Sequence, residues 1–535
     1  MDILNASNSQ SALIATVQSV EDSAVDPWSY SLSRYTPAHA KGWSNLRAVN
    51  PQQAQAGGSV FFDIPKIGWL TDCCFSCEIG WDVADATPGL DSNRKIGLPS
   101  TGWLNLIDSI VIQSASRELY RMTRASLLCA YSDLSYGKRM AIQKAMQMQN
   151  DPLMNPEGVA SNPALGTKKI LIPLLFSAFG KSDLNIPALF SEPVRVVVNF
   201  ASVFDFVAQL IPVTTVAANG AGNAPEVTFA AGALYWAGGA VNPASNAIPL
   251  SLINPTLIMQ QVSLPAELTA ATLQQNYAAG SLTQLSYNYV EETVRNTQAL
   301  SAPGDEGESY SHVLTSTNCI HDIYVYCEIP RSSWADADYN DPKVDSRELL
   351  AATATPIPLA KVSFTASGQN VVADIDAEYL GLFGRPTQGD GFFNSCGEGG
   401  FFKRTRDKNG QFVDTFVKTT GAVGLDTVFS PTSELNEQDG RDVMNSCYVY
   451  RICFSESASK MFSGNMVNLR ELSQPTITVQ LPRVSATSPD RSTEANDYLL
   501  TRAGGKQVQM RVVLRTAGLI STDSANGRTV AVLSN

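Results

Sequence analysis

The stretch KKILIPLLFSAFGKSDLNIPALFSEPVRVVVNF, residues Lys168–Phe200, contains two apolar, β-branched runs separated by Gly180-Lys181-Ser182. Those three residues end the phosphate-binding loop of many nucleotide-binding proteins, but that loop also needs a glycine five positions earlier. There the backbone N–H groups must curl around the phosphate. The position is occupied by Leu175, inside the apolar run IPLLF. We therefore interpret the stretch as two strands and their connection, not as a nucleotide site.

The composition of the chain favours large β domains. Of its 535 residues, 44% are hydrophobic and 16% are charged, which suits extensive buried cores. All-β domains often reach about 200–250 residues, so two of them fit this length. The net charge of −12 argues against direct wrapping of nucleic acid, which needs many cations to neutralise phosphates. Nine dispersed cysteines favour reduced thiols, and the opening MDILNASNSQ lacks the features of a secretory signal.

Two kinds of strand pattern recur along the chain. TITVQL (476–481) and QVQMRVVLR (507–515) alternate apolar and polar residues, as strands with one buried face do. HDIYVYCEI (321–329) and CYVYRICF (447–454) are apolar almost throughout, which predicts strands buried on both faces. Many short strands of this kind predict an all-β protein built from double-sheet jelly rolls.

The strand-rich regions define a domain plan. Residues 1–45 are rich in Ser, Ala and Asn without a sustained period, and we interpret them as an N-terminal arm that orders only against a partner. A first jelly roll is expected over 46–268, with a long loop at 212–250, and a second over 269–535, with a long loop at 378–440. Both loops are rich in Gly and turn residues, so we expect surface segments.

Helical periodicity is scarce. The main candidate is Arg117–Gln149, which predicts one or two helices broken near Ser135-Tyr136-Gly137. A shorter helix is expected over 265–275, with Pro265 at its start.

No catalytic, cofactor or metal site is predicted from the histidines and cysteines. A metal-dependent double-roll enzyme needs clustered imidazoles, but the histidines stand apart in the sequence, at His39, His312 and His321. The three neighbouring cysteines lie on a predicted strand. Cys73 and Cys77 would share one face and Cys74 the other, so buried thiols are favoured over a metal cluster.

Two acidic segments allow alternatives. DADYND (Asp336–Asp341) begins like a calcium loop, but Asp341 replaces the required glycine and Arg347 the final glutamate. An EF-hand is thereby excluded, which leaves a solvated turn, with an irregular calcium site as the alternative. Asp374, Asp376 and Glu378 would share one strand face, where an exposed surface is expected and a glycosidase pair is the alternative.

A series of motifs occurs in a characteristic order. The first half contains Ile64-Pro65 with Gly68, the strand-to-helix segment 107–134, Ile172-Pro173-Leu174, Ile186-Pro187 and Val194–Phe200. The second half contains LIMQQVSLPAEL (257–268), CYVYRICFSESASKMFSGNMVNLREL (447–472) and VQMRVVLRTAGLI (508–520). In this order, over roughly residues 55–535, they resemble double jelly-roll major capsid proteins of nucleocytoplasmic large DNA viruses, virophages and polinton-like viruses. The family's usual PFWF form is replaced by PLLFSAF.

The resemblance implies two tandem eight-stranded antiparallel jelly rolls with long inserted loops and a few short helices. It implies a non-enzymatic major capsid protein without a cofactor, whose homotrimer forms a pseudo-hexameric capsomer of an icosahedral shell around double-stranded DNA. Implied partners are further copies, minor capsid, cement and penton proteins, and an internal membrane contacted by the arm. Sequence-specific DNA binding is not expected. The implied location is the virion capsid, assembled in host cytoplasm or nucleus.

Two other function classes remain as alternatives. One is a trimeric viral spike or lectin-like adhesin, which would also be rich in β-strands. The other is a secreted β-sandwich glycan hydrolase that would use carboxylates near Asp374 and Asp376.

Overall fold

The computed structural model of the chain describes the following residues: 40–81, 95–97, 99, 101–115, 117–132, 142, 145–146, 153–154, 167–174, 184–202, 208–210, 215–217, 226–228, 234–236, 250–263, 281–292, 294, 297–299, 308–334, 353–357, 359–376, 405–406, 412–413, 449–454, 467–481, 506–523 and 526–533.

Two antiparallel sheets that face each other make up the first half of the chain, here called the first roll. Their strand orders are β1-β15-β3-β8, with β9 also paired to β3, and β2-β10-β5-β6. The bounds are β1 Ala40–Arg47, β2 Ser59–Asp63, β3 Trp69–Trp81, β5 Ile107–Ser114, β6 Arg117–Thr123, β8 Thr167–Pro173, β9 Leu184–Asn185, β10 Val194–Phe200 and β15 Leu250–Ser263.

The second half, here called the second roll, repeats this arrangement. Its sheets have the orders β16-β28-β19-β20 and β18-β27-β21-β22, and β17, β25, β26 and β29 extend the first of them. The bounds are β16 Ser281–Glu292, β17 Thr297–Ala299, β18 Ser309–Val313, β19 Cys319–Glu328, β20 Pro356–Ile357, β21 Lys361–Ala366, β22 Gln369–Asp376, β25 Tyr450–Cys453, β26 Val467–Asn468, β27 Thr476–Gln480, β28 Gln507–Asp523 and β29 Arg528–Leu533.

The two rolls have the same topology. Eight main strands follow one another in the first roll as β1, β2, β3, β5, β6, β8, β10 and β15, and in the second as β16, β18, β19, β21, β22, β25, β27 and β28. In both rolls one sheet joins the first, eighth, third and sixth strands, and the other joins the second, seventh, fourth and fifth. This is jelly-roll connectivity, so the predicted fold class of two tandem jelly rolls is confirmed.

Each roll is closed by aromatic contacts between its two sheets. In the first roll, Phe75 on β3 lies edge-on to Phe62 on β2 and Phe200 on β10, with ring centroids 6.4 and 5.7 Å apart. In the second, Phe364 on β21 packs edge-on against Phe454, which follows β25, at 5.9 Å. Burying one such ring contributes about 1.5–3 kcal/mol, so these rings stabilise the sheet pairs strongly.

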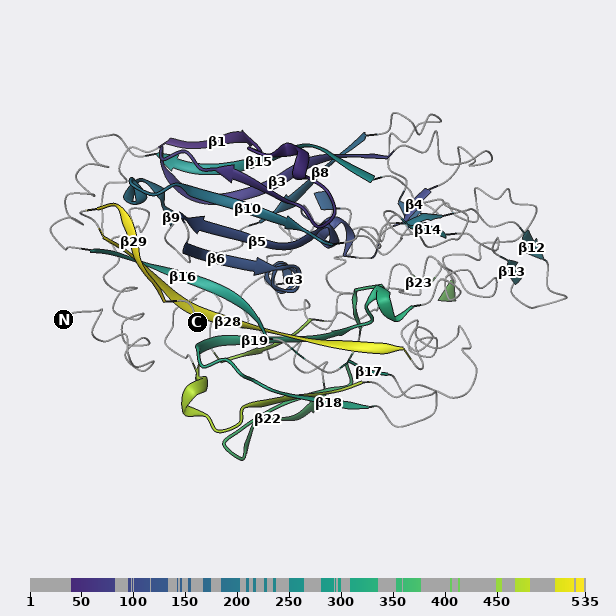
Figure 1. The fold of residues 1–535 in the computed structure, drawn as a ribbon. Coiled ribbons are helices and arrows are strands. Elements are labelled where there is room, and N and C mark those ends of the chain that lie inside the picture. Colours follow the sequence, from purple (N-terminus) through teal and green to yellow (C-terminus); the bar gives the residue numbers. More distant parts are fainter. Residues whose placement is uncertain are drawn as a thin grey trace.

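Strand burial follows the sequence patterns except in β28. The alternation predicted over 507–515 holds there only to Arg511, and residues 512–516 are all buried because this part of the inner sheet faces the first roll. β10 and β27 alternate buried and partly buried residues, as expected for strands with one core face. Every residue of β19 is buried, so the prediction of a strand buried on both faces is confirmed there. The reason is visible in Figure 1, where β19 lies inside a stack of four sheets, between the outer sheet of the second roll and the first roll.

The helix predicted over Arg117–Gln149 is only partly correct. Helix α3 spans Arg124–Ser132, whereas Arg117–Thr123 forms strand β6. A turn with Ala115 in the left-handed region, at φ 51°, connects β5 to β6, and the two strands pair antiparallel. Strand pairing satisfies the backbone of these helix-favouring residues, so tertiary context overrides their propensity.

The predicted arm of residues 1–45 is too long at its C-terminal end. Strand β1 begins at Ala40, opposite Ser263 of β15, so the first roll begins before the predicted boundary at residue 46. β1 pairs with β15 and is itself the edge strand of that sheet. Residues 1–39 lie outside the described residues, as does the helix expected over 265–275.

The predicted long loops contain short strands. Within 212–250 lie β12 Thr215–Ala217, β13 Glu226–Thr228 and β14 Leu234–Trp236, and within 378–440 lie β23 Thr405–Arg406 and β24 Phe412–Val413. β14 joins β11 Ala208–Leu210, β4 Lys95–Gly97 and β7 Leu153–Met154 in a small sheet. β4, β12, β13, β14 and β23 all lie at the right-hand end of the stack in Figure 1. The remaining loop residues are outside the described part of the chain.

Among the described residues, no helix combines the length and the apolarity needed to span a bilayer.

Candidate functional site at the joint between the two rolls

The first roll meets the second through β6 and α3, which pack against β16 and β28. We call this contact surface the joint. Thr123, at the end of β6, donates its hydroxyl to Glu291 on β16 at 2.7 Å, and Ser126 on α3 donates to the carbonyl of Tyr289 at 3.0 Å. Figure 1 shows α3 between the inner sheets of the two rolls. The rolls are thus joined by direct side-chain contacts as well as by the chain that connects them.

A partly buried ion network, centred on the buried Glu328, crosses the joint. Arg124, in the first turn of α3, donates from Nη2 to both carboxylate oxygens of Glu328 on β19, at 2.8 and 3.0 Å. Arg511 on β28 donates from Nε to Glu328 at 3.0 Å and from Nη1 to Glu291 at 2.7 Å. Two cations and two carboxylates therefore balance one another. Arg124 also donates to the carbonyl of Ala354 at 3.2 Å.

The network holds Glu328 ionised although its side chain is 1% exposed. Burial alone would favour the neutral acid, but the guanidinium groups of Arg124 and Arg511 outweigh burial and hold the pKa of Glu328 below its usual range. The reciprocal effect of Glu328 raises the pKa of Arg511 against the opposing effect of burial. Removing Arg124 would leave the Glu328 carboxylate with Arg511 as its one remaining guanidinium partner, which is costly for so deeply buried a charge.

A second ionic cluster lies on the same inner sheet. Asp322 on β19 is fully buried and accepts from Arg451 on β25, with Nε at 3.0 Å and Nη2 at 2.9 Å. Arg515 on β28 places Nη1 at 3.5 Å from the other oxygen, and His321 Nδ1 lies 2.9 Å from that oxygen. Burial opposes ionisation, but Arg451, His321 and Arg515 hold the pKa of Asp322 well below its usual range.

Aromatic rings complete the Asp322 cluster. The Arg451 guanidinium lies 5.6 Å from the ring centroid of Tyr324, and that of Arg515 lies 5.7 Å from the ring centroid of Tyr289. The two tyrosine rings are 5.9 Å apart. Cation–π contacts gain strength where water is excluded, so the rings help to hold two buried arginines around one carboxylate.

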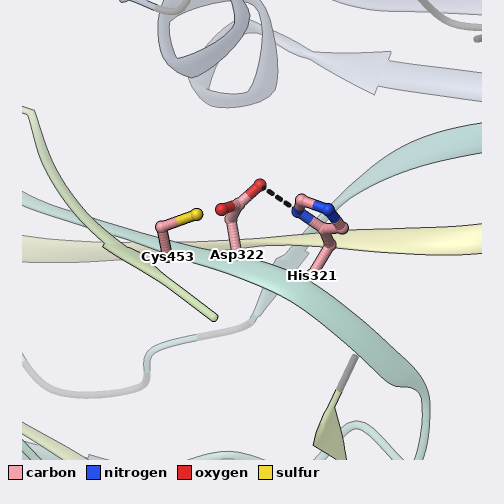
Figure 2. Close-up of side chains that lie close together, drawn as sticks. All are labelled: His321, Asp322 and Cys453. Carbon is pink, nitrogen blue, oxygen red and sulfur yellow. Dashed lines mark hydrogen bonds and ion pairs between the residues drawn. The ribbon is translucent and has the colours of Figure 1, made fainter. Parts of the chain in front are cut away.

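His321, Asp322 and Cys453 could in principle hold a metal, because their donor atoms lie within 4.8 Å of one another. Figure 2 shows all three side chains on one side of the sheet, with the imidazole hydrogen-bonded to the carboxylate. However, Arg451 contacts two of the three residues, donating to Asp322 and, at 3.7 Å, to Cys453 Sγ. A divalent cation there would face two guanidinium groups, so these residues fit an ion cluster better than a metal site.

The three cysteines at positions 73–77 behave as buried thiols. Cys73 and Cys77 face the first-roll core, and Cys74 lies on the other face of β3 and is partly buried, as the alternation predicted. Burial raises the pKa of Cys74 to about 12, and it raises the pKa values of Cys73 and Cys77 as well. Thiols held protonated in this way are poor metal ligands.

The histidines and the acidic strand residues considered as candidate site residues do not form a common site among the described residues. His312 on β18 lies 3.7 Å from Glu292, whereas His321 belongs to the Asp322 cluster. Asp374 and Asp376 lie on β22, an edge strand of the outer sheet of the second roll. The remaining candidates lie outside the described residues: His39, Gly180-Lys181-Ser182, Asp336–Asp341, Arg347 and Glu378.

The ion networks were not anticipated from sequence, although a signal was present. Asp322, Glu328 and Arg451 interrupt two strands that are otherwise apolar and buried. A charged residue in such a strand must find a partner of opposite charge, because an unpaired buried charge is costly. These charged residues predict that partners of opposite charge exist, but the sequence does not show which residues those partners are.

Comparisons with known proteins identify the fold. No protein-family model matches the sequence, and no curated protein is significantly similar to it. Among solved structures, PBCV-1 VP54, fitted into a reconstruction of the virophage Sputnik, gives a TM-score of 0.55 at 10% identity and covers 95% of this chain and 100% of that chain. The quasi-atomic PBCV-1 virus capsid gives 0.53 at 12% identity, with the same coverage. The cryo-EM structure of the Sputnik virophage gives 0.50 at 8% identity, covering 94% and 90%. The chain shares the double jelly-roll fold of these structures over nearly its whole length.

Proposed function

We propose that this chain is the major capsid protein of a double-stranded DNA virus and that three copies form a pseudo-hexameric capsomer. The observation that carries the proposal is the repeated jelly-roll topology over nearly the whole chain, in the same fold as the PBCV-1 capsid. Two rolls in each of three chains give six lobes, and a six-lobed object can occupy a hexagonal position in an icosahedral lattice.

The joint supports this role. A tile keeps its outline only if its two rolls hold a fixed relative position. We propose that charged groups that pair across the joint, such as Arg124 with Glu328, fix the register and orientation of the two rolls. Contacts between chains in a permanent trimer should bury about 2,000–5,000 Å².

The loops and the arm give the proposed tile its outer and inner surfaces. We assign residues 212–250 and 378–440 to loops that rise at one end of the rolls, consistent with the common position of β12, β13, β14 and β23 in Figure 1. We assign the N-terminal arm to contacts with neighbouring subunits, minor capsid, cement or penton proteins, or an internal membrane. The proposed domains are the arm, a first roll ending near residue 268 and a second roll over 269–535.

The proposal includes no catalytic step or cofactor and places the protein in the virion capsid, after assembly in host cytoplasm or nucleus. The net charge of −12 favours other components for direct DNA contact. Both ion clusters fit a structural role, because their charged groups are shielded and paired within the protein.

Size-exclusion chromatography with light scattering, followed by negative-stain imaging, tests the proposal. The expected particle has three times the chain mass of 57.5 kDa and a compact, nearly hexagonal projection. An elongated trimer would instead indicate a spike or adhesin, and a monomer that cleaves glycans would indicate the hydrolase. Either result would overturn the capsid proposal.

A further inference from the structure

Strand β1 has a free edge. It is the outermost strand of its sheet and pairs with β15 in an unbroken register from Ala40–Ser263 to Arg47–Thr256. No described strand pairs with its other edge. Residues 41–45 are all exposed, so both faces of β1 are open along most of its length. An exposed edge without a bulge or proline is a template for another strand.

Trp43 makes this edge unusual. Its side chain is 61% exposed in the middle of β1, opposite Gln260 of β15. The space beside the neighbouring Gly42 is open, since a Cβ atom built on this residue would have no other atom within 4 Å. A large exposed ring beside open space on an unpaired edge indicates a surface that another segment covers.

The chain carries a segment that matches this edge just before β1. Residues 28–35 read WSYSLSRY, in which Trp28, Tyr30 and Leu32 alternate with serines. This alternation over the six residues 28–33 is a strand signal inside a region that has no longer period. It is followed by Thr36-Pro37-Ala38-His39, where proline suits the second position of a tight turn.

The turn length fixes which residues would lie opposite one another. A two-residue turn at 37–38 and a four-residue turn at 36–39 give the same antiparallel register, with residue 32 opposite 43 and 31 opposite 44. Leu32 would then lie beside Trp43, and Ser31 would lie beside Ser44. Cross-strand neighbours point to the same face, so the apolar residues would cover the exposed ring. A turn of three residues would instead place Ser31 or Ser33 opposite Trp43.

We propose that residues 28–35 of the same chain form a strand on the free edge of β1 and cover Trp43. Attachment in the same chain follows from the short connection, since a turn of two to four residues holds the segment next to the edge. This strand would extend the sheet to the order 28–35, β1, β15, β3, β8. The proposal is independent of the capsid function.

Disulfide trapping tests the register. In the full-length chain, Ser31→Cys with Ser44→Cys places thiols opposite each other, whereas the control pair Ser31→Cys with Asn45→Cys places them on opposite faces. Mild oxidation followed by trypsin should yield a disulfide linking peptides 1–34 and 42–47 from monomer-sized protein. We expect at least about tenfold more of this product than in the control, because a disulfide needs Cβ atoms about 3.5–4.5 Å apart.

Amide hydrogen exchange supplies an independent readout. Amides of residues 41, 43 and 45, which point away from β15, should be protected in the unmodified chain. Leu32→Pro should increase their exchange at least about tenfold, because proline removes the donor that faces Trp43. Ser9→Pro, far from the segment, is the control. Equal cross-linking in both cysteine pairs, or fast exchange in the unmodified chain, would overturn the proposal. Links found mainly between chains would overturn the same-chain assignment and indicate strand exchange between copies.

Discussion

Nη2 of Arg124 lies 2.8 Å from Oε1 of Glu328, although 204 residues separate the two in the sequence. This ion pair connects the first helix turn after β6 to the last residue of β19, and thus one roll to the other. Because the Glu328 side chain is buried, this pair should contribute more to stability than an exposed pair such as Arg121 with Glu118.

The first prediction concerns this pair. Arg124→Ala should lower the free energy of unfolding by about 3 kcal/mol, because it leaves the buried Glu328 carboxylate with only one of its two guanidinium partners. Urea denaturation measures the change. The matched control is Arg121→Ala, which removes an ion pair with Glu118 whose side chains are 50% and 43% exposed; it should cost less than about 1 kcal/mol. Equal losses would contradict a special role for the joint.

Acid should destabilise the fold through Asp322 and Glu328. Both have folded-state pKa values below their unfolded values, which lie near 3.9 and 4.3. The stability they contribute is therefore present above the unfolded pKa values and is lost as pH falls further. The thermal midpoint should be level above about pH 5 and should fall steeply below about pH 4.

Asp322→Asn separates this effect from general acid unfolding. At neutral pH it should destabilise the protein, because Arg451 and Arg515 lose their shared counter-charge. Below about pH 4 its stability should fall less steeply, by up to about 1.4 kcal/mol per pH unit. Asp63→Asn, in an exposed pair with Arg195, should leave the acid profile unchanged. A parallel decline in both variants would contradict the assignment to Asp322.

The two rolls should unfold together. Phe75→Ala removes the ring that contacts Phe62 and Phe200, and Phe364→Ala removes a ring that packs between the two sheets of the second roll. Each should cost about 3–5 kcal/mol. Because the joint couples the rolls, differential scanning calorimetry should show one transition that moves in both variants. Two separate transitions, each sensitive to only one substitution, would show that the rolls are independent.

The cysteines should resist modification in the native state. Burial raises the pKa of Cys319 to about 11, and it raises the pKa values of Cys73 and Cys77, so few of these thiols are ionised at pH 8. We expect Cys73 and Cys77 to react with an aromatic disulfide reagent only after unfolding, when all nine cysteines of the chain become reactive. Peptide mass spectrometry identifies each site. The partly exposed Cys453 is the internal comparison, and rapid native labelling of Cys73 would contradict the burial argument.

Limited proteolysis should distinguish the long loops from the sheets. We expect the first cuts within 212–250 and 378–440, since inserted surface segments expose more cleavable backbone than paired strands do. Cuts should come later in β27, whose alternate residues lie in the core, and in β28, which is buried over most of its length. Mass spectrometry of early fragments reports the order. First cleavage within 476–480 or 507–523 would oppose the assignment.

Sequence patterns predicted the sheets well because one strand's burial is a local property. β27 shows its alternation in five residues, and the apolar run of β19 shows that both of its faces are covered. The same local reasoning failed for Arg117–Thr123, whose helix-favouring residues form β6 because β5 pairs with them. A periodicity is recognised within a short stretch of sequence, and it carries no information about which other strand will pair with that stretch.

The joint could not be predicted for a related reason. The presence of Glu328 in a buried strand predicts a cationic partner, but Arg124 and Arg511 lie far from it in either direction along the chain. Their meeting depends on how the two rolls stand against each other. That arrangement is encoded in packing over many residues, so no single motif reveals it.

The order of the strands also has a consequence during synthesis. β28 lies between β16 and β19 but follows both in the sequence, so the inner sheet of the second roll stays incomplete until residues 507–523 have been made. The first roll has all its strands once β15 has left the ribosome, and it can fold while the rest is still being made. Arg124 lacks its counter-charge until Glu328 has been made, 204 residues later. A chain that lacks β28 would leave a gap between β16 and β19 and would leave Glu328 without Arg511, one of its two guanidinium partners.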